Sequence, residues 1–286
     1  MVCLIKKLRV RVLVENSTSI RNIDLLGKHG LGLFLEAEKE NGEKIAILMD
    51  VGPSPDVITH NLDILKLNLD MVNLIFLSHG HYDHTGGLIE VLKRMNRKVP
   101  IIAHPKIFSP KYTAKFRYVG LPFTRSDVEK FGGMFLLAKN SVKIAEDIVT
   151  TGEIERVTEF EDVKGFITVE DGVFKDDFMP DDQALIFNMK EKGLVVVSGC
   201  AHAGIVNTVK HAQKITGVNK IYGVLGGFHL EGASQKRIDL TIEELAKFKP
   251  KIVGPCHCTG FKAINQIANF FKENFVLVQT GDLIEI

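Results

Sequence analysis

The segment 78–88, with the sequence SHGHYDHTGGL, concentrates side chains that bind metals. Its potential ligands are His79, His81, Asp83 and His84. Such a cluster cannot pack against apolar neighbours without a large desolvation cost, which a bound divalent metal removes. The alternative is a polar, glycine-rich loop, but four potential ligands at this spacing are rarely only that. The segment therefore predicts a site for one or two divalent metal ions, with zinc as the first candidate and manganese, iron or magnesium as alternatives.

The elements that must position this cluster alternate between strands and helices. Strands are predicted at 8–14, 32–38, 44–49, 71–77, 99–103, 184–189, 194–198, 220–225, 251–254, 275–278 and 282–286, and helices at 56–67, 88–95, 205–215, 235–248 and 261–271. Each group of histidines directly follows a strand, where the loops of α/β proteins carry chemistry. The pattern predicts an α/β fold, an αββα sandwich of two mixed β-sheets with outer helices, formed by residues 1–286 as a single domain.

The composition narrows the classes of partner. The 286 residues carry a formal net charge of +1, with 45% hydrophobic and 25% charged residues. This balance gives no whole-surface attraction to nucleic acid or to anionic membranes. The N-terminal sequence lacks the long apolar run of a secretory signal, and charges interrupt every apolar stretch before it reaches membrane-spanning length. We expect a cytoplasmic protein whose partner is a small molecule, without nucleic acid or membrane partners and with the oligomeric state left open.

The central motif resembles that of a known superfamily. HGHYDHTGG is similar to the HxHxDHxGG signature of the metallo-β-lactamase superfamily, and ILMDVG at 47–52 resembles the strand end that precedes this signature there. The resemblance implies the metallo-β-lactamase fold over nearly the whole chain. It also implies that His79 and His81 bind one metal and that Asp83 and His84 bind a second. Asp50, at the end of its strand, is placed to orient one of these histidines.

Further ligands must come from later strand ends. We expect His202, in VVVSGCAHAGI, to bind the first metal and His257, in VGPCHCTG, to bind the second. Superfamily members often carry a histidine before the hairpin at 184–198 and a bridging aspartate after it. This chain has DDQ at 181–183 and Cys200 at the bridging position. Either His202 substitutes for the missing ligand, or Cys200 joins it.

Two histidines outside these positions have other interpretations. His229, in LGGFHLEG, is either a core-edge residue or a pocket residue that donates a proton or contacts an anion. We expect His104 to take no part in metal binding. Gly226 and Gly227 could let backbone amides approach a ligand closely.

Three of the four cysteines lie within two residues of a histidine, and the low total argues against a disulfide framework. If the segment around His257 is extended, Cys256 and Cys258 both point away from that histidine. They could be soft metal ligands, but we expect small buried hydrophobic side chains.

The segment 106–182 mixes short strands with charged turns, and hairpin strands are predicted at 142–149 and 166–174. We expect it to be an insertion that covers the active site and supplies substrate contacts. It contains a basic run interleaved with aromatic residues: Lys111, Lys115, Arg117 and Arg125. This run is either a phosphate-binding lid or a solvated loop.

A narrower resemblance bears on the reaction. HGLGL near residue 29, GCAHAGIVNTV, GGFHL and PCHCTG are similar to a subgroup described as 7,8-dihydropterin-6-yl-methyl-4-(β-D-ribofuranosyl)aminobenzene 5'-phosphate synthases of methanopterin biosynthesis. This implies a metal-dependent transferase that joins a dihydropterin methyl diphosphate to a ribofuranosylaminobenzene phosphate and releases diphosphate. One alternative is a hydrolase of a small phosphorylated, ester or lactone substrate, in which Asp83 binds metal or takes a proton. Another is a non-catalytic, metal-stabilised binding protein.

Overall fold

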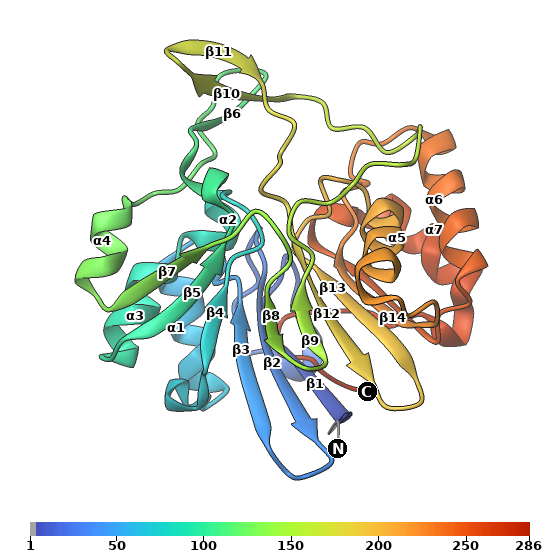
Figure 1. Cartoon of the computed structure of the whole chain (residues 1–286), viewed down its shortest axis with the longest axis horizontal. Coiled ribbons are helices and arrows are strands. Elements are labelled where there is room, and N and C mark those ends of the chain that lie inside the picture. The colour runs from blue at the N-terminus through green and yellow to red at the C-terminus, as the bar shows by residue number, and fades with distance from the viewer. Residues whose placement is uncertain (1–3) are drawn as a thin grey trace.

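The computed structural model describes residues 4–286 and arranges them in four layers, with helices outside two packed layers of strands (Figure 1). The first half supplies β1 (Ile5–Val14), β2 (Gly32–Lys39), β3 (Lys44–Met49), β4 (Leu74–Phe76), β5 (Val99–Ala103) and β7 (Gly133–Leu137). The second half supplies β12 (Ala184–Met189), β13 (Gly193–Ser198), β14 (Ile221–Gly227) and β15 (Ile252–Cys256). The strand order β15-β14-β13-β12-β1-β2-β3-β4-β5-β7 makes one continuous sheet. The predicted αββα sandwich is confirmed.

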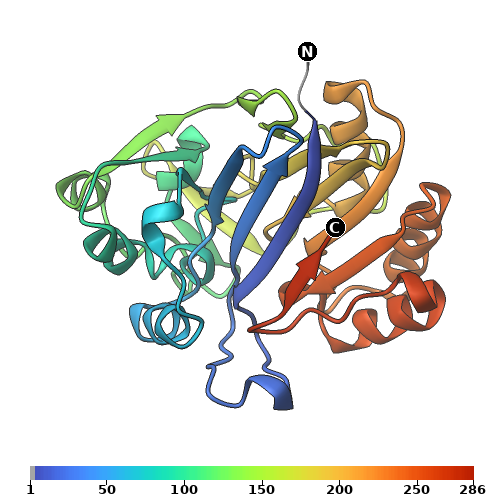
Figure 2. The same cartoon turned by 90° about the horizontal axis from the view of Figure 1, so that it is seen from below.

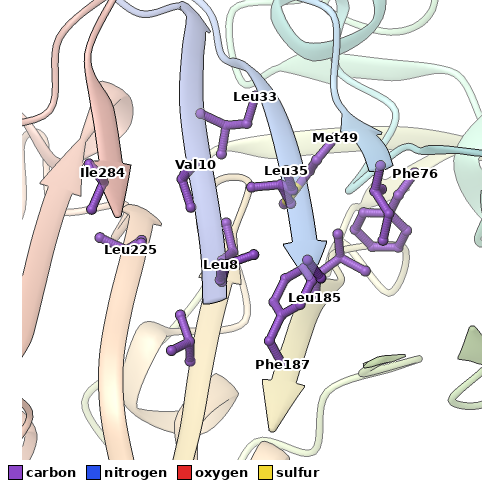
Figure 3. Packing of buried hydrophobic residues seen from close by; sticks show 14 of the residues in the cluster. Leu8, Val10, Leu33, Leu35, Met49, Phe76, Leu185, Phe187, Leu225 and Ile284 are labelled. Atoms are coloured by element: carbon purple, nitrogen blue, oxygen red, sulfur yellow. The ribbon is translucent and has the colours of Figure 1, made fainter. Parts of the chain in front are cut away.

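The sheet folds over on itself at a narrow join. β1 and β12 run parallel and pair through a single register position, Ile5 opposite Met189. The inner faces of the two halves then pack together. Leu8 of β1, Phe76 of β4 and Phe187 of β12 belong to this inner cluster and are fully buried (Figure 3). Burial of each such side chain contributes about 1.5–3 kcal/mol, so this cluster stabilises the packing of the two halves.

Two sets of helices cover the outer faces (Figures 1 and 2). One side carries α1 (Pro55–Ile64), α3 (Leu88–Met95) and α4 (Arg125–Lys130), and the other carries α5 (Ile205–Thr216), α6 (Gln235–Lys247) and α7 (Phe261–Phe271). The helices are amphipathic, as in α3, where Leu88, Val91 and Leu92 are buried and Lys93 is exposed. None of the helices within residues 4–286 has the length and apolarity needed to cross a membrane.

Most predicted elements appear within a few residues of their expected bounds, and one predicted strand is wrong. Residues 275–278 form no strand and contribute one isolated bridge, Val253 opposite Phe275. β16 (Leu283–Glu285) follows and pairs antiparallel with β1. The apolar side chains at 275–278 predicted a strand, but this stretch lacks the continuous backbone pairing that defines one.

The segment 106–182 is more than an insertion, because parts of it complete the main sheet. β7 pairs with β5, and the hairpin of β8 (Lys143–Ala145) and β9 (Ile148–Thr150) pairs with β12. The remaining strands, β6 (Lys111–Thr113), β10 (Phe166–Glu170) and β11 (Val173–Asp176), form a separate small sheet. This small sheet lies above the sandwich at the end where α2 (Tyr82–Thr85) begins (Figure 1).

Lys111 joins the small sheet to the loop that carries the motif. Its Nζ lies 2.7 Å from Asp181 Oδ1 and 3.1 Å from Asp177 Oδ2, and all three side chains are buried. The other oxygen of Asp181 accepts a hydrogen bond from Gly80 N at 2.8 Å. Burial lowers the pKa of Lys111, but the charges of Asp181 and Asp177 outweigh that effect and raise it. The expectation that Lys111 contacts substrate is therefore wrong, since charge alone in the sequence does not distinguish a buried lysine from an exposed one.

Replacement of this buried cation tests its structural role. Lys111→Met keeps an unbranched side chain but leaves two buried carboxylates without their partner, so we expect the free energy of unfolding to fall by about 3–5 kcal/mol. Lys115→Met, at an exposed position nearby, should change it by less than about 0.5 kcal/mol. Urea denaturation followed by circular dichroism measures both. Equal stabilities of the two variants would contradict the assignment.

Candidate metal centre

The loop after β4 and the short helix α2 bring the motif histidines together in the protein interior. His79 Nε2 lies 3.1 Å from His81 Nδ1, and both residues are buried. The His202 ring, from the loop after β13, has its centroid 4.8 Å from that of His79 and 5.0 Å from that of His81. These three imidazoles, contributed by both halves of the sandwich, form the first donor group.

A second donor group lies directly beside the first. His84 Nε2 is 3.1 Å from His257 Nε2 and 3.1 Å from Cys200 Sγ. Asp83 Oδ2 is 3.4 Å from His257 Nε2. The six predicted ligands and Cys200 thus converge, although residues 79–84 and residue 257 are far apart in the sequence.

Asp50 fixes the orientation of the second donor group through hydrogen bonds to His84 and Ser78. His84 Nδ1 lies 2.6 Å from Asp50 Oδ2, and the same carboxylate accepts hydrogen bonds from Ser78 N and Ser78 Oγ. Burial lowers the pKa of His84, but the charge and hydrogen bond of Asp50 outweigh it and raise the pKa to about 9. Because His84 Nδ1 is hydrogen-bonded to Asp50, His84 Nε2 faces the donor group. This is the orientation that a metal ligand needs.

The remaining histidines have free nitrogen atoms. Among the residues that the structure describes, His81 Nε2 and both ring nitrogens of His202 are buried without a hydrogen-bond partner. Burial lowers the pKa of His81 to about 3 and also lowers the pKa values of His79 and His202 well below the usual range. These rings are therefore neutral, and buried nitrogens without partners are costly unless something binds them. A divalent metal fits this donor set.

Three of the twelve non-glycine residues with positive φ within residues 4–286 lie at the centre. Asp50, His229 and His257 have φ values of 56°, 49° and 51°. Non-glycine residues seldom adopt this left-handed conformation, and its cost of about 1–3 kcal/mol per residue is typical of functional sites.

Three residues near the N-terminus also contact the centre, and the sequence motifs did not predict this role for them. His257 Nδ1 lies 2.9 Å from Asn16 Oδ1, and Glu15 Oε1 accepts a hydrogen bond from His257 N at 2.8 Å. His29 Nε2 lies 3.1 Å from Asp83 Oδ2, and that hydrogen bond raises the pKa of His29 despite partial burial. Glu15 and Asn16 are the first two residues after β1, so their strand-end position was the available signal.

The cysteines near His257 differ from the prediction. Residues His257–Thr259 form a 3₁₀ turn instead of an extended segment. Cys256 lies in the apolar inner cluster as expected, but Cys258 faces the site, where its Sγ donates a hydrogen bond to Cys200 O at 3.4 Å. The expectation that Cys258 is a buried hydrophobic side chain is therefore wrong.

A cavity of about 780 Å³ opens onto the two donor groups. Its apolar walls come from Phe166, Phe261, Ile264, Leu277 and Val278, and its charged lining includes Arg117 and Glu231. His229 also lines it, with its ring centroid 4.1 Å from that of His202 and with Nδ1 buried and unpartnered among residues 4–286. Such a chamber, apolar with a few polar groups beside reactive donors, suits a small organic molecule.

Other predicted positions lie elsewhere. Lys115 is exposed, and Arg125 is exposed on α4, where it pairs with Glu129; neither lines this cavity. His104 Nε2 lies 3.1 Å from Glu153 Oε1, and the donor groups found within residues 4–286 do not include it.

Comparison with known proteins identifies the family. The sequence profile of the metallo-β-lactamase superfamily matches residues 38–183, which include the whole HGHYDHTGG motif. The chain belongs to the metallo-β-lactamase superfamily. Its fold and its converging donor groups agree with the divalent-metal binding that this superfamily suggests.

Two proteins of Methanocaldococcus jannaschii are similar to this superfamily member over most of its length. One, a 7,8-dihydropterin-6-methyl-4-(beta-D-ribofuranosyl)-aminobenzene-5'-phosphate synthase, is 39% identical, with 92% of each chain covered. The other, an uncharacterized protein, is 31% identical over 97% of this chain and 100% of its own. A solved structure, a metal-dependent hydrolase of the β-lactamase superfamily, superimposes with a TM-score of 0.81 at 25% identity and covers 98% of this chain and 99% of its own.

Removal of one donor from each group tests the centre. In the His81→Ala, Asp83→Ala double variant we expect metal affinity to fall by more than the roughly 10- to 100-fold that loss of an outer hydrogen-bond partner costs. Elemental analysis of dialysed protein measures the bound metal, and His60→Ala is the control, because His60 lies on α1 and contacts the Asp24 carbonyl. Wild-type protein that holds less than about half an equivalent after reconstitution would contradict a metal centre.

Proposed function

We propose that the protein is a metal-dependent transferase that joins a dihydropterin methyl diphosphate to a ribofuranosylaminobenzene phosphate with release of diphosphate. The observation that carries this proposal is the 39% identity, over 92% of both chains, to the synthase of that name. In the reaction, the arylamine nitrogen forms a bond to the pterin methylene carbon, the carbon–oxygen bond to diphosphate breaks, and the nitrogen loses a proton.

We assign metal binding to His79, His81 and His202 in the first group and to Asp83, His84 and His257 in the second. Divalent ions held there, with zinc as our first choice, would supply positive charge that stabilises the diphosphate leaving group. Asp50 keeps the His84 imidazole oriented through its 2.6 Å hydrogen bond.

The other residues of the cavity fit the two substrates. His229 Nδ1, buried and free of partners among residues 4–286, is our candidate to accept the proton from the attacking nitrogen. Phe166 and Phe261 offer aromatic faces to the pterin and aryl rings. Arg117 offers a guanidinium to the ribosyl phosphate. We propose that the small sheet β6-β10-β11, which contributes Phe166, covers the substrates and excludes water.

A hydrolase is the second candidate. The superimposed structure with a TM-score of 0.81 is a metal-dependent hydrolase, and the same donor set would serve the attack of water on a small phosphorylated, ester or lactone substrate. Metal binding without turnover would instead indicate a binding protein.

A product assay separates these functions. The metal-loaded protein is mixed with the pterin diphosphate, with the ribosyl arylamine phosphate, and with both. We expect diphosphate only when both are present, together with a coupled product that mass spectrometry detects. Diphosphate release from the pterin compound alone would support hydrolysis, and the absence of turnover in every mixture would contradict both catalytic proposals.

Arg117 and Arg125 form a matched pair for testing phosphate recognition. Arg117 lines the cavity, and the residues that the structure describes make no ion pair with its guanidinium, whereas Arg125 pairs with Glu129 on α4. Loss of one charge-assisted hydrogen bond costs about 1.5–3 kcal/mol, so Arg117→Ala should raise the KM for the phosphorylated arylamine roughly 10- to 100-fold with little change in kcat. Arg125→Ala should leave both constants unchanged. Steady-state kinetics that show equal effects would exclude this role for Arg117.

A further inference from the structure

We propose that the Glu231 carboxylate binds the 2-amino-4-oxopyrimidine ring of a pterin and thereby makes the cavity specific for that substrate. This inference rests on the proposed function, because it concerns the recognition of the pterin diphosphate. The potential metal-binding sets found within residues 4–286 do not include Glu231, so its role is separate from that of the donor groups.

Glu231 has the one carboxylate of the cavity wall without a partner among residues 4–286. Three acidic residues line the cavity, namely Glu15, Asp83 and Glu231. Both carboxylate oxygens of Glu15 accept hydrogen bonds from neighbouring protein groups. Asp83 Oδ2 lies 3.1 Å from His29 Nε2 and belongs to the second donor group. The Glu231 carboxylate makes no such hydrogen bond or ion pair within the described part of the chain, so both of its oxygens can accept hydrogen bonds from a ligand.

Two neighbouring segments hold this carboxylate at the cavity wall. Glu231 N donates a hydrogen bond to Cys258 O at 3.0 Å, which ties the loop after β14 to the turn beside the metal centre. Gly260, the residue before α7, has a φ of +77°, and a Cβ there would lie 1.7 Å from Glu231 Oε2. The carboxylate therefore lies against Gly260 at a place that a larger residue would fill. The N-terminus of α7 carries partial positive charge, which attracts the carboxylate without forming a side-chain cap bond.

Arg117 and Glu231 form two separate charged ends of the same cavity. Arg117 comes from the loop after β6, and Glu231 comes from the loop after β14. The two residues form no ion pair with each other in the described chain, so neither charge neutralises the other. A guanidinium suits a phosphate, and a carboxylate suits a group that offers N–H donors. We therefore place the phosphate of the arylamine substrate at Arg117 and the pterin at Glu231.

The pterin ring offers the donors that a free carboxylate binds. Its ring N3–H and its 2-amino N–H point in the same direction, so one carboxylate accepts both, as it does from an arginine side chain. Phe261 directly follows Gly260, is 83% exposed and lines the same cavity, where its ring face is available for stacking. A stacked ring excludes water from the carboxylate, and the lower local dielectric strengthens both hydrogen bonds.

Pterin binding by the metal-loaded protein tests this role of Glu231. In lumazine an oxo group replaces the 2-amino group, so one donor is lost and a carbonyl oxygen faces the carboxylate. Fluorescence titration of wild-type protein should show pterin bound at least about tenfold more tightly than lumazine. Glu231→Gln should weaken pterin binding about 10- to 100-fold and remove the preference over lumazine. Glu243→Gln, at an exposed position on α6, should change neither affinity.

Steady-state kinetics separate this proposal from the proposed reaction. In Glu231→Gln we expect the KM for the pterin diphosphate to rise about 10- to 100-fold, whereas the KM for the phosphorylated arylamine stays within about twofold of the wild-type value. A rise in the arylamine KM alone would place the ribose hydroxyls at Glu231 and overturn the proposal.

The comparison of the two rings needs no variant, so it decides the proposal even if Glu231→Gln fails to fold. Wild-type protein that forms the coupled product but binds pterin and lumazine equally would overturn the role of Glu231 and leave the transferase function standing. Preferential binding of pterin without product would support the site and contradict the transferase reaction. Wild-type protein that binds neither ring and forms no product would overturn both.

Discussion

The buried carboxylate of Asp50 is the interaction on which the centre depends. It is fully buried, it accepts both hydrogen bonds from Ser78, and it contacts His84 at 2.6 Å. It thereby ties the end of β3 to the loop after β4 and to α2. Gly199 lets the loop after β13 approach the same carboxylate. The second half of the sandwich therefore contacts the first half at Asp50. A buried charge is tolerated only when such partners satisfy it.

The seam between the two halves explains why the centre forms at one end of the sandwich. His79, His81, Asp83 and His84 come from the first half, and His202 and His257 come from the second. Both sets follow the carboxyl ends of parallel strands, β3-β4-β5 and β13-β14-β15, which is where loops converge in such sheets. The single register position that joins β1 to β12 allows the two sheets to face each other. The inner apolar cluster packs the two halves against each other, and the donor groups meet at one end of this seam.

Local patterns in the sequence predicted the parts of this arrangement that depend on neighbouring residues. Short stretches of sequence predict the motif from His79 to His84 and the helix after it. They also predict the strand ends before the later histidines. Contacts between distant residues left no such signal: Asn16 and His257 meet across 241 positions. Charge gave the wrong role for Lys111, because its partners Asp177 and Asp181 are brought to it by the fold. Alternation gave the wrong orientation for Cys258, because a 3₁₀ turn replaces the expected extended segment.

The apolar cavity beside the donor groups suits transfer to an amine. The departing diphosphate carries high negative charge, which positive charge in a cavity of low dielectric would stabilise. Phe166 and Phe261 reduce the water beside the reacting carbon, which matters because water competes with the arylamine nitrogen. The aromatic walls would thus disfavour hydrolysis relative to attack by the second substrate.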